Sequence, residues 1–229
     1  MLTETRRAIG VSILILAACS GAFAQAPQIA RGGVVNAASW ASPITPGATI
    51  AIFGSNLAAK MQSASAPLPF ALGGTSVTVN GVPAPILFVS PTQINVQVPA
   101  SIAAPDSSIG AVPVVVTNSG GSSAPEIAGV TSTAPGFFSA DGSGCGSAAA
   151  LNIRPDGTAS VNSPSNSAAP GDYIALFGTG FGLAAQQPSD GAAAMGTPPL
   201  QSVPRLFLDN NPVSSLAWAG LAPTLVGVD

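Results

Sequence analysis

The sequence predicts an all-β protein made of two tandem β-sandwiches, the second of which lacks its last strands. Only 7% of the 229 residues are charged, whereas the surfaces of helices are normally covered by Lys, Glu and Arg. Short β-branched runs alternate with Gly, Pro and Asn turns, and no stretch shows the 3.6-residue apolar period of a helix. One motif of the first half recurs in the second half, which indicates two copies of one unit.

The first half contains five expected strands, each a short apolar run that ends at turn residues: 49–53, 75–79, 85–89, 93–98 and 112–117. The second run ends in Asn80-Gly81, which is the strongest short signal for a hairpin. The fourth run places Ile94, Val96 and Val98 on one face and polar residues on the other, as in a half-buried strand. Strands and turns at this spacing are typical of a sandwich.

An internal repeat defines the second unit. The motif Pro46-Gly-Ala-Thr-Ile-Ala-Ile-Phe-Gly54 returns 124 residues later as Pro170-Gly-Asp-Tyr-Ile-Ala-Leu-Phe-Gly178. The hairpin motif Val77-Thr-Val-Asn-Gly-Val-Pro83 returns 129 residues later as Leu206-Phe-Leu-Asp-Asn-Asn-Pro212. Because the order and the chemistry of both motifs are kept, we expect one kind of sandwich twice.

The two expected sandwiches, over residues 25–133 and 134–229, differ at their ends. Asp229 falls about where Thr92 lies in the first unit, so the second unit has no counterpart of residues 93–99 or of the strand that follows them. A sandwich without its late strands has unpaired backbone groups and an open apolar face. We therefore expect the chain to be a fragment of a fuller parent protein.

Residues 1–24 are expected to be a signal peptide. A basic start precedes an uncharged apolar run over residues 8–18, which is shorter than the ~20 residues of a membrane span. Two processing sites compete. Cleavage after Ala24 would release a secreted protein, whereas a lipobox ending at Cys19 would give a lipid anchor, the only expected attachment to a membrane. Either way the protein is exported, to the periplasm, the cell surface or the medium.

Five longer motifs carry a family resemblance: Val34-Val-Asn-Ala-Ala-Ser-Trp40, Leu72-Gly-Gly-Thr-Ser-Val-Thr-Val-Asn-Gly-Val-Pro-Ala-Pro85, Val89-Ser-Pro-Thr-Gln-Ile-Asn-Val-Gln-Val-Pro99, Ala134-Pro-Gly-Phe-Phe138 and Ala219-Gly-Leu-Ala-Pro223. They resemble the uncharacterised C-terminal domain family of secreted acidobacterial (Solibacter-type) proteins. The resemblance spans residues 33–229 and implies tandem immunoglobulin-like sandwiches related to IPT/TIG domains. It implies no catalytic or ligand-binding residues, because none are established for that family.

The residue types argue against catalysis, cofactors and metals. The chain has no His, so a hydrolytic triad has no ordinary base and zinc or copper has too few ligands. The glycines of Gly178-Thr-Gly-Phe-Gly182 are followed by Leu183 and not by the helix of a dinucleotide site. No Asp-rich loop collects charge for Ca²⁺, and six basic residues against nine acidic ones argue against nucleic acid.

The sequence therefore predicts a non-catalytic exported module of unknown ligand, acting as a spacer, a stabilising domain or a surface-interaction domain. The expected partner is an extracellular glycan or protein. Two alternatives stay open: a carbohydrate-binding module that uses loop aromatic residues, with Trp40 as the candidate, and a Ca²⁺-dependent adhesin. Trp218 is expected to be a core anchor, because large aromatic side chains dominate the energetics of cores.

Overall fold

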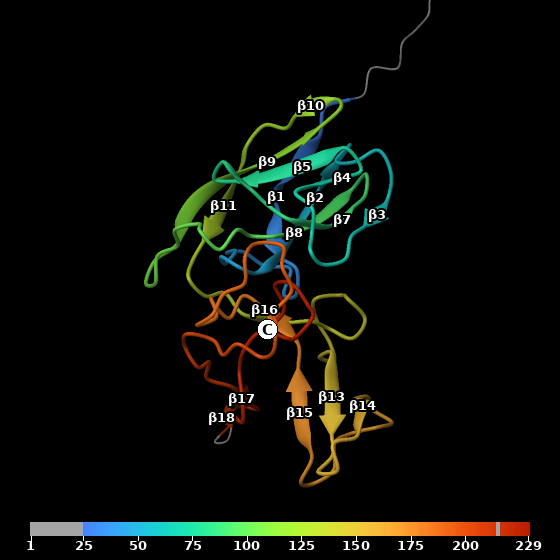
Figure 1. The fold of residues 1–229 in the computed structure, drawn as a ribbon, viewed down its shortest axis with the longest axis vertical. Coiled ribbons are helices and arrows are strands. Elements are labelled where there is room, and N and C mark those ends of the chain that lie inside the picture. Colours follow the sequence, from blue (N-terminus) through green and yellow to red (C-terminus); the bar gives the residue numbers. More distant parts are fainter. Residues whose placement is uncertain (1–24, 214–215) are drawn as a thin grey trace, which may run out of the picture.

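The regular structure of the described residues consists of β-strands, which confirms the all-β fold class. The computed structural model describes residues 25–213 and 216–229 (Figure 1). The strands are β1 (Gln28–Asn36), β2 (Thr49–Ser55), β3 (Gln62–Ser63), β4 (Ala71–Leu72), β5 (Thr75–Val79), β6 (Val82–Pro83), β7 (Ile86–Val89), β8 (Gln93–Gln97), β9 (Gly110–Asn118), β10 (Gly121–Ser122), β11 (Glu126–Val130), β12 (Gly136–Phe137), β13 (Ala150–Ile153), β14 (Ala159–Val161), β15 (Tyr173–Leu176), β16 (Gly178–Thr179), β17 (Phe207–Leu208) and β18 (Asn211–Pro212). Cys19 and Ala24, the predicted lipidation and cleavage residues, lie outside this range. Within it, no helix is long and apolar enough to cross a membrane.

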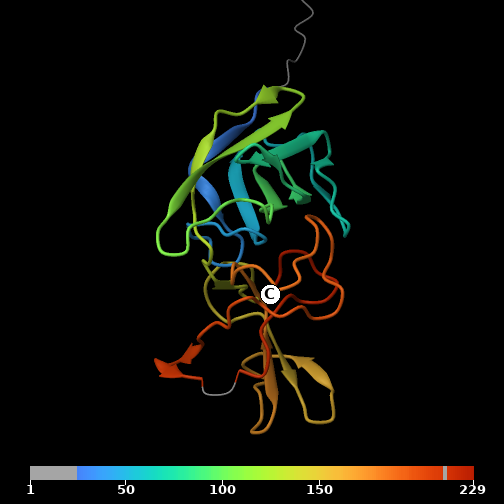
Figure 2. The same ribbon diagram turned by 60° about the vertical axis from the view of Figure 1, so that its left-hand side comes forward.

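Strands β1 to β11 form an antiparallel sandwich (Figures 1 and 2). One sheet has the order β1-β2-β8-β7-β3, and the other has the order β10-β9-β5-β4, with β11 also paired to β9 and β6 to β5. The five expected strands are present as β2, β5, β7, β8 and β9, with ends shifted by at most two residues. The core between the sheets is aliphatic and includes Ile50, Ile52, Ile94 and Val96.

The second half has shorter strands and a smaller core. Its described residues form a three-stranded sheet of order β14-β13-β15 and two short ladders, β12–β16 and β17–β18. A separate buried cluster consists of Ala184, Ala194 and Leu221. The all-β expectation therefore holds here too, while two sandwiches in tandem stay a prediction.

Strand β15 repeats the pairing of β2. Ile50 of β2 lies opposite Asn36 of β1, and Ile174 of β15 lies opposite Asn152 of β13. Both asparagine side chains are buried. The offset of 124 residues between Ile50 and Ile174 is that of the sequence repeat, so the repeated motif takes the same place in its sheet.

The two repeated hairpins also correspond. Strands β5 and β6 are joined by Asn80-Gly81, and β17 and β18 are joined by Asp209-Asn210. All four residues have positive φ, as a two-residue turn of type I′ requires. The hairpin expected from the Asn-Gly step is thus confirmed.

Hydrogen bonds of the buried residues Asn36 and Thr179 join the two halves. The side-chain amide of Asn36 donates to the carbonyl groups of Ala134 and Thr179, at 2.9 and 3.3 Å. The hydroxyl of Thr179 accepts from the backbone N–H of Thr49 at 2.9 Å and donates to the carbonyl of Gly227 at 2.6 Å. The second half therefore lies against one end of the sandwich, as Figure 2 shows.

Candidate functional site

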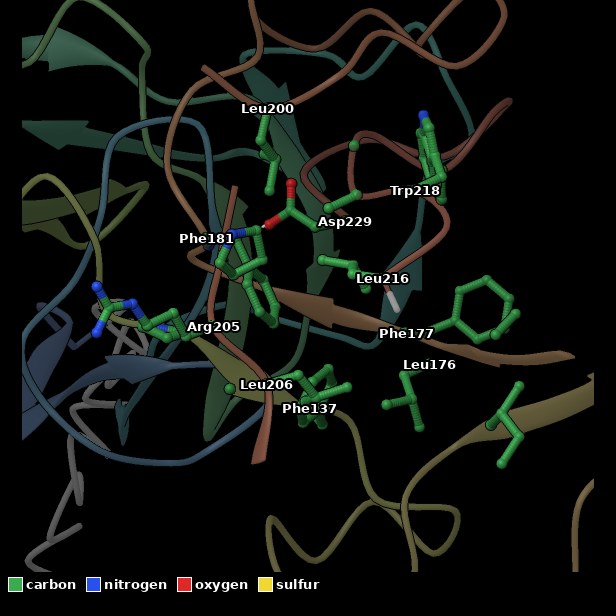
Figure 3. A pocket seen from close by; sticks show the side chains of 18 of the residues that line it. Phe137, Leu176, Phe177, Phe181, Leu200, Arg205, Leu206, Leu216, Trp218 and Asp229 are labelled. Atoms are coloured by element: carbon green, nitrogen blue, oxygen red, sulfur yellow. Dashed lines mark hydrogen bonds between the residues drawn. The ribbon is translucent and has the colours of Figure 1, made fainter. Parts of the chain in front are cut away.

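The second half contains an open apolar cleft of about 530 Å³ (Figure 3). One wall consists of residues 174–176 of β15 and the adjoining Phe177. Leu216 and residues 218–220, with Trp218 among them, form another part of the lining. The remaining lining comes from loops and short strands: Pro135, Gly136, Phe137, Ile153, Phe181, Leu200, Pro204, Arg205, Leu206, Ala222, Pro223 and Asp229. This volume lies within the ~300–1,000 Å³ typical of ligand sites.

Among the described residues, strand β15 has a neighbour on one side only, which leaves apolar side chains such as Ile174 exposed in the cleft. Ile174 is 55% exposed, whereas Ile50, its counterpart in β2, is fully buried. In the first half β8 covers the second edge of β2, while among the described residues β15 pairs with β13 alone. Side chains that the repeat would place in a core therefore face an open space.

Aromatic side chains line the cleft next to these aliphatic ones. The rings of Phe137 and Phe181 pack with their centroids 5.4 Å apart in a tilted arrangement. Trp218 is 45% exposed, so the expectation that it is a core anchor is wrong in the described chain. The physical reason is that no described strand covers the segment that carries it.

Two charged residues line the cleft, Arg205 and Asp229. The backbone of Asp229 pairs with that of Gly178: the N–H of Gly178 donates to the carbonyl of Asp229 at 3.0 Å, and the reverse bond is 2.9 Å long. The side chain of Asp229 accepts from the N–H of Phe181 at 3.2 Å (Figure 3). Burial raises the pKa of this carboxyl to about 6, while the N–H groups of Phe181 and Gly180 act in the opposite direction.

We expect this carboxyl to make the stability of the protein depend on pH. Its folded-state pKa of about 6 lies above the ordinary value of 3.8, so the folded state binds the proton more tightly than the unfolded state. The free energy of unfolding should therefore fall as the pH rises from about 4 to about 7, by up to about 3 kcal/mol. Urea unfolding over this range measures the slope. Asp229→Asn should remove this part of the pH dependence. If the stability of the variant changes with pH as steeply as that of the wild type, the raised pKa of Asp229 is not its cause.

Trp40, the candidate for stacking on sugars, lies in the first half. It has a φ of 55° and its side chain is 47% exposed. Its ring packs against that of Phe53 with centroids 5.4 Å apart. Gly144 also lies close to the ring, because a Cβ atom added to Gly144 would be only 2.8 Å from it. Trp40 is not among the residues that line the cleft.

The lining points to binding of apolar surface. Of the described residues that line the cleft, none is a Ser, Thr, Cys or Lys that could serve as a nucleophile. Elsewhere in the described ranges, Cys145 is a free and exposed thiol. Across residues 25–213 and 216–229, no three His, Cys, Asp or Glu side chains gather closely enough to hold a metal ion. What the described lining offers to a ligand is mainly apolar surface.

The sequence indicated only part of this site. The repeat identified residues 173–177 as the counterpart of the segment that forms β2. Phe137, Leu206 and Asp229 were not predicted to take part. Leu206 belongs to the repeated hairpin motif and Phe137 to the motif Ala134–Phe138, but neither motif indicates which side chains lie beside β15.

Comparisons with known proteins identify the first half. Residues 34–132 match the family model of the IPT/TIG domain. The matched range covers nearly all of the β1 to β11 sandwich, which is thus an immunoglobulin-like domain of IPT/TIG type. Neither a search of curated proteins nor one of solved structures gives a match. The acidobacterial family resemblance stays a prediction.

Proposed function

We propose that this protein is a non-catalytic exported module that attaches to another extracellular molecule through the apolar cleft of its second half. An IPT/TIG domain is a general, non-enzymatic immunoglobulin-like module, and such a domain forms the first half. The observation that carries the proposal is the cleft itself, whose described lining is mostly apolar and includes two charged side chains. Exposed apolar patches of this kind mark interaction sites.

The cleft favours an interaction role over a role as spacer. A spacer needs a rigid fold and a polar surface, and an open cleft that exposes Ile174 and Trp218 contributes to neither. When an apolar group covers such a surface, water is released from it. The resulting gain in free energy is roughly 25 cal/mol for each Å² of apolar area that is buried. The second half therefore gains stability from a bound partner, by mass action.

We expect the fluorescent apolar probe 8-anilinonaphthalene-1-sulfonate to bind the cleft saturably. Ile174→Asp should weaken binding at least fivefold, because it places a charge on the cleft wall. Ile127→Asp is the matched control, since Ile127 is a strand isoleucine of the first half with an exposed fraction of 61%. A fluorescence titration measures both. Equal probe binding by Ile174→Asp and the wild type would overturn the proposal.

A further inference from the structure

We infer that the IPT/TIG sandwich binds a neutral saccharide in a polar depression of about 330 Å³ at the end of its strands. Loops from both sheets line it. Among the lining residues, Asn56 and Ala58 follow β2, Gly74 joins β4 to β5, Pro91 precedes β8 and Ser119 follows β9. The inference goes beyond the proposed function, because this depression and the cleft share no lining residue.

The strand pairing places the depression at the end of the sandwich opposite the second half. Strands β1 and β2 run antiparallel, with Asn36 opposite Ile50 at one end and Gln28 opposite Ser55 at the other. Asn36 donates hydrogen bonds to the second half, whereas Asn56 directly follows Ser55. In Figure 1 the depression therefore lies toward the end where β10 is labelled.

Hydrogen bonds fix the loops around the depression. The side-chain amide of Asn118 donates to the carbonyl of Asn56 at 2.7 Å, and its oxygen accepts from the N–H of Gly120 at 2.8 Å. The buried hydroxyl of Thr75 donates to the carbonyl of Leu57 at 3.2 Å. These bonds tie the loop after β2 to the start of β5 and the end of β9. A ligand therefore meets a site whose shape is already formed, which lowers the cost of binding.

Two polar side chains of the lining are available to a ligand. Within residues 25–213 and 216–229, neither the side-chain amide of Asn56 nor the hydroxyl of Ser119 forms a hydrogen bond with the protein, although both residues line the depression. An amide group both donates and accepts hydrogen bonds, and so does a hydroxyl group. They can therefore bind the hydroxyl groups of a ligand, which also do both.

The turn between β4 and β5 has no side chains, which leaves its backbone uncovered at the depression. Gly73 and Gly74 have φ values of 59° and 80°, in the region that glycine adopts without strain. A Cβ atom added to Gly73 would meet the Oε1 atom of Gln62. This buried acceptor has no partner among the described residues, and an unpaired buried acceptor costs free energy. A ligand hydroxyl that reaches past Gly73 would satisfy it.

The residue types of the lining select a neutral ligand. Of the described residues that form it, none carries a charge, so a buried anion or cation would lose its hydration without gaining an ionic partner. Ala58, Ala59 and Pro91 add small apolar surfaces that suit the C–H faces of a sugar ring. The volume lies at the lower end of the ~300–1,000 Å³ of small-molecule sites. A short neutral saccharide fits this combination.

The test starts from an array of neutral oligosaccharides built from glucose, galactose, mannose and N-acetylglucosamine. The best binder is then labelled with fluorescein and titrated by fluorescence anisotropy, in which we expect saturable binding. Asn56→Gly should weaken it at least tenfold, because glycine lacks the amide but readily adopts the φ of 54° found there. The matched control is Asn80→Gly, at an exposed asparagine with a φ of 49° outside the depression, and it should bind within twofold of the wild type.

Further arms separate the ligand classes and the two sites. The uronic-acid form of the same saccharide should bind at least fivefold more weakly, and equal binding would refute the selection of a neutral ligand. Equal binding of a labelled Gly-Ser-Gly-Ser-Gly-Ser peptide would show that the site takes polypeptide backbone and not sugar. Ile174→Asp should leave saccharide binding unchanged, since Ile174 lines the cleft. Loss of binding in Ile174→Asp would place the sugar in the cleft and overturn the inference.

Residues 1–24 precede Gln25, which lines the depression, so the whole chain is compared with the form cleaved after Ala24. Both forms should bind the saccharide. Binding by the cleaved form alone would support the site and show that residues 1–24 cover it before cleavage. Binding by the whole chain alone would show that those residues hold the sugar, and it would overturn the inference. An array without a binder, or an Asn56→Gly variant that binds as the wild type does, would overturn it as well.

Discussion

Replacing Asn36 with leucine is expected to lower the free energy of unfolding by about 3 to 5 kcal/mol. The Asn36 side chain is buried and makes four hydrogen bonds. Its amide donates to the carbonyls of Ala134 and Thr179, and its oxygen accepts from the N–H groups of Ala38 and Ser39, at 2.8 and 3.1 Å. Leucine has a similar size but satisfies none of these groups, and a buried polar group without a partner costs about 1–3 kcal/mol. Urea unfolding followed by circular dichroism measures the loss.

Asn152→Leu is the matched control, because Asn152 occupies the same place opposite β15 that Asn36 occupies opposite β2. Its side chain is buried, and it bonds only within the second half, to the carbonyl of Asn166 at 2.8 Å and to the amide of Asn162 at 2.7 Å. We expect a smaller loss of stability from this change, and the two halves should stay joined. If Asn36→Leu costs less than about 1 kcal/mol, Asn36 does not hold the halves together.

The strands of the first half could be predicted because the residue pattern of each strand follows from which of its faces is buried. In β5 and β8, one face lies on the core and the other does not, so apolar and polar residues alternate along the chain. The Asn80-Gly81 turn has the positive φ values that its residues favour. Strand β1 was not predicted as a strand, because Arg31-Gly-Gly33 interrupts its apolar run and the register with β2 shifts between Ile29 and Val34.

The site could be predicted only as far as the repeat extends. Comparison with β2 gives the place of β15 and the alternation of its side chains. The exposure of Trp218 could not be predicted from the tetrapeptide that carries it, since Leu-Ala-Trp-Ala is apolar whether or not a strand covers it. The short β12–β16 ladder depends on contacts between the halves, such as the hydrogen bonds between Asn36 and Thr179 and between Thr49 and Thr179, and local sequence does not encode those.

Ile50→Ala and Ile174→Ala are expected to differ strongly although the two residues occupy equivalent positions. Ile50 is fully buried in the sandwich core, and truncation of a buried isoleucine to alanine costs about 2–5 kcal/mol through lost transfer free energy and a cavity. Ile174 is half-exposed and has no strand over it, so the same truncation should cost less than about 1 kcal/mol. Urea unfolding of both variants measures the difference.

The comparison of Ile50→Ala with Ile174→Ala isolates what a covering strand contributes to stability, because backbone register, residue type and substitution are the same at both positions. Equal losses would contradict the view that Ile174 lacks the cover that β8 gives Ile50.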